Sequence, residues 1–192
     1  MTPPRWREAG TDPAYVPDRE AFDAYTHPEI WQLVHEALDP AALGRTAEGW
    51  QVGAAALEQL FEAFAAAVRQ EFAEWSGRAA AAARESTETF VRSGTAAQDV
   101  CAAVHRLMEL NSSAAQTVRD AIPPPSTPYA PDPDPVREAI DGGPRKMAHD
   151  IAAATALADA QDTLTFLYNS TLVASGDAVP AFEGPVRGEN AR

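Results

Sequence analysis

Residues 46–77 read TAEGWQVGAAALEQLFEAFAAAVRQEFAEWSG, and this stretch decides the fold. Its apolar side chains recur at steps of three and four, with charged residues between them: Trp50, Ala54, Leu57, Phe61, Phe64, Val68, Phe72 and Trp75. This spacing predicts an amphipathic helix with one aromatic-rich face. The helix meets a turn at Trp75-Ser76-Gly77, where Gly77 suits a left-handed or tight backbone position.

A second long helix is expected from this turn to Ile122. Its apolar seam alternates steps of four and three for about five heptads, which favours left-handed supercoiled packing. A parallel seam runs beside it from Ala96 to Ala114, so the distal half of the helix should contact two other helices. Two polar or small seam positions stand out. Gly94 either lets the backbone of a partner helix approach closely or is a local weak point in the packing. Asn111 either specifies the register of the helices or lies at the solvent-exposed edge of the interface.

The flanking segments complete an expected all-α fold: an elongated antiparallel long-helix hairpin in a helical bundle, with short N-terminal and additional C-terminal helices. A short helix opens at Pro28, and Gly44 with Thr46 should interrupt the chain before the hairpin. Another short helix should end at Asp141-Gly142-Gly143-Pro144. The predicted organisation is a flexible N-terminal arm (1–24), the hairpin domain (25–125), a proline-rich linker with a short helix (126–144), a C-terminal helix (145–175) and a mobile tail (176–192).

Composition argues against most chemical functions. A net charge of −13 disfavours nucleic acid and anionic membrane surfaces, and no stretch is apolar enough to span a bilayer. The four histidines form no paired ligand motif, and the single Cys101 lies on the helical seam. We therefore expect no catalytic residues, no metal site and no cofactor, and a function exercised by binding.

The aromatic-striped helix, the Trp75-Ser76-Gly77 turn, the longer Ala-rich helix and the following Pro123-Pro124-Pro125 together resemble the WXG superfamily of type VII secretion substrates. The larger helical domain, Trp50 and the Ala121–Pro125 run look most like its PPE-type branch. The resemblance covers about Glu29 to Pro125. The N-terminal Pro-Pro-Glu signature of that branch is absent, because the chain begins Met1-Thr2-Pro3-Pro4-Arg5.

The resemblance implies a hairpin that pairs side by side with another WXG-like or PE-like protein, or with itself, with a secretion chaperone or ATPase as a further partner. It implies a cytoplasmic protein that is then secreted or surface-bound without signal-peptide cleavage. Trp75 and Gly77 would supply one half of a composite secretion signal. Tyr25 and Glu29 fit the Y-x-x-x-D/E half but precede the hairpin, so a partner is expected to supply that half. The expected partner-binding face comprises Trp50, Leu57, Phe61, Phe64, Val100, Leu107 and Leu110.

Three other readings remain open on the sequence. The chain fits a cytoplasmic adaptor or chaperone that escorts a type VII-secreted partner and is not exported itself. It also fits a structural helical homodimer completed by the third helix. An enzyme built on a helical bundle is disfavoured by the missing ligand pairs.

Overall fold

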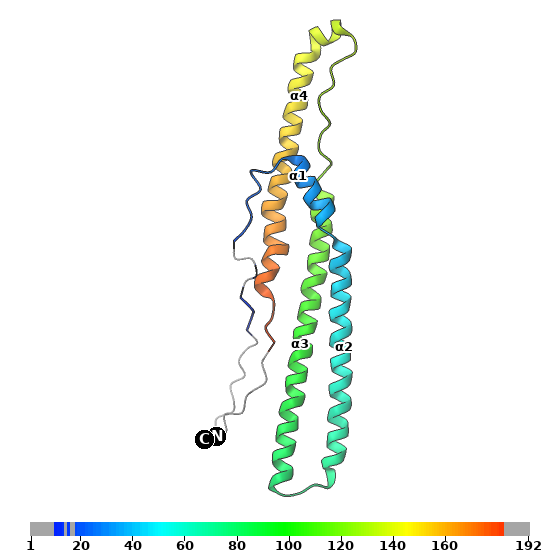
Figure 1. Cartoon of the computed structure of the whole chain (residues 1–192), viewed down its shortest axis with the longest axis vertical. Coiled ribbons are helices and arrows are strands. Elements are labelled where there is room, and N and C mark those ends of the chain that lie inside the picture. Colours follow the sequence, from blue (N-terminus) through cyan, green and yellow to red (C-terminus); the bar gives the residue numbers. More distant parts are fainter. Residues whose placement is uncertain (1–9, 14, 16–17, 183–192) are drawn as a thin grey trace. The chain divides into compact units, whose positions relative to one another are not determined.

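The computed structural model describes residues 10–13, 15 and 18–182. Within these residues the chain is all-α, as predicted, and its one extended pairing is an isolated antiparallel bridge between Thr11 and Pro180. The helical elements in chain order are α1 (His27–Gln32), the π-turn η1 (Leu33–Ala37), α2 (Pro40–Glu71), the 3-10 turn η2 (Phe72–Glu74), α3 (Arg78–Ala121), α4 (Pro135–Asp162), the π-helical η3 (Thr163–Val173) and the 3-10 turn η4 (Gly176–Ala178) (Figure 1).

The chain divides into two compact units. The hairpin unit is built on Ala42–Leu110, joined by the described residues of both terminal segments. The core unit is built on Asn111–Gly176 and on the described residues 18–41. Each unit combines segments that are far apart in the sequence, so the structure does not follow the consecutive domains that the sequence predicts.

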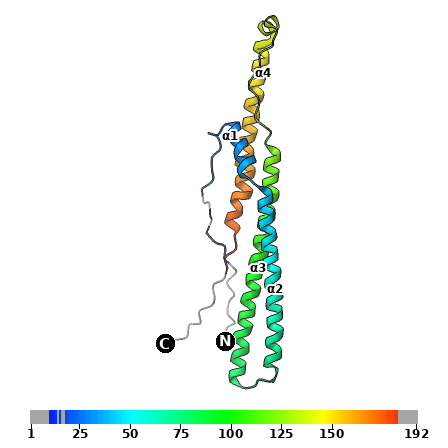
Figure 2. The same ribbon diagram turned by 45° about the vertical axis from the view of Figure 1, so that its right-hand side comes forward.

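In the hairpin unit, α2 and α3 run side by side and are joined at the predicted turn (Figures 1 and 2). The predicted interruption at Gly44 and Thr46 is wrong, because α2 begins at Pro40 and continues through both residues. A glycine inside a helix costs only about 1 kcal/mol relative to alanine. The Thr46 hydroxyl donates to the carbonyl of Ala42 at 3.0 Å, which is compatible with an unbroken helix.

A hydrophobic cluster among the described residues lies in the core unit. Its buried members come from five helical elements, from the segment before α1 and from the residue after α3: Phe22, Ile30, Val34, Val118, Ile122, Ala160 and Leu164. Val118, near the end of α3, belongs to the same cluster as residues of α1, η1, α4 and η3. Asn111 is buried and donates to the Ser175 hydroxyl at 2.8 Å, so it is not a solvent-edge residue.

The predicted helix end at residues 141–144 is wrong, because α4 runs unbroken from Pro135 to Asp162 with Pro144 inside it. A proline in a helix interior removes one backbone hydrogen bond. The surrounding side chains hold this turn. The Tyr129 hydroxyl donates to the Gly142 carbonyl at 3.3 Å, and Arg145 bonds to Glu138 at 2.5 Å. Glu138 lies close over Gly142, since a Cβ there would lie 2.2 Å from a Glu138 carboxylate oxygen and the carboxylate would have to move.

The described parts of the two terminal segments, which the sequence predicts as a flexible arm and a mobile tail, are joined by backbone hydrogen bonds; residues 1–9, 14, 16–17 and 183–192 lie outside the described chain. The Asp12 amide donates to the Val179 carbonyl at 2.9 Å, and the Ala181 amide donates to the Gly10 carbonyl at 2.8 Å. Phe22, inside the predicted arm, is buried in the core unit. The backbone bonds pair the two segments, and one large apolar side chain anchors residues that show no helical periodicity.

Candidate binding site

The tip of the hairpin is formed by the end of α2, the turn η2 and the start of α3. The Trp75 amide donates to the Phe72 carbonyl at 3.2 Å, and the indole ring of Trp75 lies 5.1 Å from the Phe72 ring. Gly77 has a φ of 91°, which confirms the predicted left-handed position. The Trp75 side chain remains about half exposed at this turn, so it is available to a second molecule.

Arg84 ties the tip together, and sequence reasoning missed it. Its guanidinium group, on α3, donates to the backbone carbonyls of Phe72 and of Trp75, the latter at 2.6 Å. The last carbonyls of a helix lack partners within the helix and carry partial negative charge, so a cation placed there is favourable. Arg84 therefore caps the end of the first helical arm from the opposite arm.

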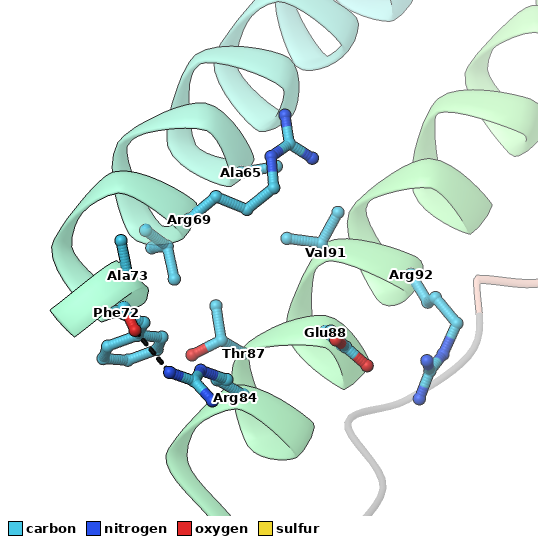
Figure 3. Close-up of a pocket in the computed structure, with 10 residues that line it drawn as sticks. Ala65, Arg69, Phe72, Ala73, Arg84, Thr87, Glu88, Val91 and Arg92 are labelled. Carbon is cyan, nitrogen blue, oxygen red and sulfur yellow. Dashed lines mark hydrogen bonds between the residues drawn. The ribbon is translucent and has the colours of Figure 1, made fainter. Parts of the chain in front are cut away.

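Beside this cap lies a cavity of about 450 Å³ between α2 and α3 (Figure 3). Its apolar lining comes from both helices and includes Val68, Phe72 and Val91. Three arginines and one acid also line it: Arg69, Arg84, Arg92 and Glu88. The cavity walls are therefore mainly apolar, and Arg84 is already engaged with the tip carbonyls.

The hairpin unit buries very little. Its buried residues, among those described, are small: Ala47, Ala54, Ala80, Gly94, Val100, Cys101 and Val104. Among the described residues of this unit, no buried side chain is larger than valine. Most of its large apolar side chains are half-buried or exposed, since two helices alone can cover only the line along which they meet.

The residues of the predicted partner-binding face are buried, half-buried or exposed in the structure. Val100 is buried within the unit, and Phe61 lies against Gly94, where an added Cβ would approach the ring to 2.2 Å. The close approach at Gly94 is therefore made by a phenyl ring and not by a backbone. Leu110 and Phe64 are exposed. Trp50, Leu57 and Leu107 are half-buried.

An aromatic cluster marks the most apolar part of the hairpin surface. The Phe90 ring on α3 lies 5.4 Å from the Phe61 ring and 5.5 Å from the Phe64 ring, both on α2. Tilted and edge-to-face contacts at this spacing are favourable. Phe90 is nevertheless 56% exposed. The cluster therefore holds the two arms together and still presents an aromatic surface.

Tyr25 and Glu29 belong to the core unit and make local contacts. The Tyr25 hydroxyl donates to the Glu20 carboxylate, and this bond, with the charge of Glu20, raises the pKa of the phenol. Glu29 accepts from the Thr26 hydroxyl at 2.7 Å and the Thr26 amide at 2.8 Å, which lowers the pKa of its carboxyl. Glu29 thus completes a capping box at the start of α1.

The described residues contain no group of three or more ligating side chains that could hold a metal ion. None of the described helices is both long and apolar enough to cross a bilayer. No family model, no curated protein and no solved structure matches this chain. The candidate binding site therefore rests on the geometry of the hairpin: its capped tip, the adjacent cavity and the exposed aromatic cluster.

Proposed function

We propose that this chain is a non-enzymatic binding protein whose hairpin unit pairs with a second helical-hairpin protein. One observation carries the proposal: the hairpin unit buries no side chain larger than valine among its described residues, while Phe64, Phe90 and Leu110 stay exposed. Burying such a side chain contributes on the order of 2 kcal/mol. A second pair of helices laid against α2 and α3 at the aromatic cluster would cover Phe64 and Phe90.

From the sequence resemblance, we propose that the pair is exported as a WXG/PPE-like type VII secretion substrate. It is supported by a Trp-x-Gly turn at the tip, with Gly77 at positive φ and Trp75 exposed to recognition. Because Tyr25 and Glu29 are engaged in local hydrogen bonds, the proposed partner supplies the tyrosine half of the signal. The protein is then cytoplasmic before export and secreted or surface-bound afterwards, without a cleaved signal peptide.

The pairing is tested by light scattering on the full chain co-expressed with the proteins encoded beside it. We expect a stable complex with a small helical neighbour, weakened at least tenfold by Phe90→Asp. Val52→Asp is the matched control. Val52 is 69% exposed and lies nine positions, or two and a half turns, before Phe61, so it is on the opposite face of α2. A complex that both variants weaken equally, or no complex at all, would refute the hairpin face as the partner site.

The export step needs a separate measurement in the source cells. We expect the wild-type chain in the culture medium or at the surface, and Trp75→Ala retained inside with its partner still bound. Since Trp75 is half exposed, its loss should leave the fold intact, which circular dichroism checks. Wild-type chain that stays in the cells while its partner is exported would favour the adaptor function and refute the substrate function.

A further inference from the structure

A line of exposed apolar side chains follows one face of α4 in the core unit. Val136, Ile140, Met147 and Ile151 are each between 60% and 69% exposed. At 100° per residue their positions fall within an arc of about 60°, so they form a single narrow stripe. We call these four residues the α4 stripe.

The opposite face of α4 is already covered by the chain itself. The proline-rich segment (residues 123–134) returns along this face: the Tyr129 ring lies 5.7 Å from the His149 ring, and His149 Nε2 lies 2.8 Å from the Thr127 carbonyl oxygen. Arg145 pairs with Asp132 at 3.0 Å. These contacts fix the face of α4 that lies opposite the α4 stripe. The α4 stripe is thus presented on a helix that is already fixed by internal contacts.

The spacing of the stripe is symmetric about its midpoint at 143–144. Val136 and Ile151 lie at equal distances from that point, and so do Ile140 and Met147. In an antiparallel pair of identical helices related by a two-fold axis at the midpoint, Val136 faces Ile151 of the second copy and Ile140 faces Met147 of the second copy. A two-fold interface requires this kind of self-complementary pattern.

The centre of the stripe also leaves room for a close approach. Gly143 carries no side chain, and an added Cβ there would have no atom within 4 Å. Small residues at a helix crossing allow the two backbones to come together. Residues 135–158 carry three basic and three acidic side chains, so this segment is neutral in a chain whose net charge is −13. Two copies therefore meet here without the repulsion that the acidic chain imposes elsewhere.

We propose that the α4 stripe is a self-association site, at which a second copy of this chain binds in antiparallel orientation across residues 136–151. Four such side chains supply roughly 100 Å² each, or about 800 Å² for both copies. The flanking small residues and the aliphatic stems of Arg137 and Lys146 would bring the total near the ~1,200 Å² lower bound of stable interfaces.

The register is tested by disulfide trapping between two full-length variants, Ile140→Cys and Met147→Cys, mixed under mild oxidation. We expect a crosslink between the two variants and little crosslinking within either one, because residues seven apart along a helix differ by about 10 Å in height. Wild-type chain is the control for Cys101, which is buried. Crosslinking of Ile140→Cys to itself in preference to Met147→Cys would overturn the antiparallel arrangement.

The surface is tested by sedimentation equilibrium of the full chain over a range of concentrations. We expect Ile140→Glu to weaken self-association at least tenfold, and the equally exposed Val52→Glu to leave it unchanged. A wild-type chain that stays monomeric at ~100 µM, or a dimer indifferent to Ile140→Glu, would overturn the proposal. This site can be tested separately from the proposed hairpin pairing, because Phe90→Asp should weaken that pairing and leave self-association intact.

Discussion

The contact between Gly94 and Phe61 allows a quantitative test of the hairpin packing. An alanine Cβ at position 94 would lie 2.2 Å from the tip of the Phe61 ring, against the 3.4 Å at which ordinary contact begins. The ring must therefore move by about 1.2 Å, and overpacking of this kind costs roughly 1–3 kcal/mol. Replacing glycine by alanine inside a helix stabilises the helix by about 1 kcal/mol. We expect Gly94→Ala to lower the free energy of unfolding by about 1 kcal/mol.

Gly53→Ala is the matched control, because Gly53 lies inside α2 and an added Cβ there has nothing within 4 Å. It should raise the free energy of unfolding by about 0.5–1 kcal/mol through helix propensity alone. Urea titration followed by far-ultraviolet circular dichroism compares the two, with Phe61→Leu in the Gly94→Ala background as a rescue. Equal stabilisation by both alanines would refute the packing of Phe61 on Gly94.

Two further predictions concern single interactions. Arg84→Met should destabilise the tip by about 1 kcal/mol, because the carbonyls of Phe72 and Trp75 lose their donor, whereas Arg78→Met in the same helix should not; hydrogen exchange at the tip compares the two variants. The second concerns acid. Hydrogen bonding, first from the Asp132 amide and then from Arg145 and Tyr129, lowers the pKa of Glu138. The ionised Glu138 carboxylate therefore stabilises the core unit fully at any pH above about 4.3, the pKa of glutamate in the unfolded chain. This stabilisation is lost as the pH falls through the lower pKa that Glu138 has in the folded chain. The protection factor of the Asp132 amide, which removes the intrinsic pH dependence of exchange, should fall over that range in the wild type and be low throughout in Glu138→Ala. A wild-type protection factor that does not change with pH would contradict this assignment.

The two long helices could be predicted from the sequence because their signals are local. The apolar period of three and four defines the faces, and Gly77 followed later by Pro123 defines the ends of α3. The breaks expected at Gly44 and at Pro144 were wrong for a common reason. A single helix breaker costs a few kcal/mol at most, and neighbouring contacts such as the Tyr129 bond to the Gly142 carbonyl come from residues that periodicity does not relate.

The candidate site was predictable only in part. Trp75 and Gly77 stand out because they interrupt a regular pattern, and the structure places them at the tip. Arg84 carries no such signal, because its role depends on a guanidinium group reaching carbonyls across the turn. The seams identified which side chains are apolar but not which partner covers them. Phe61 and Phe64 belong to one apolar stripe, yet the first packs on Gly94 and the second is exposed.

The two units differ in how far they bury their large apolar side chains, and this difference supports a binding function. The core unit fully buries Ile30, Val118 and Ile122, because several elements converge on them. The hairpin unit has two long helices and no third layer among its described contacts that would bury a large side chain. A chain selected only for stability gains from covering Phe64 and Phe90. Aromatic side chains kept at the surface of a regular, capped hairpin are instead typical of an interface.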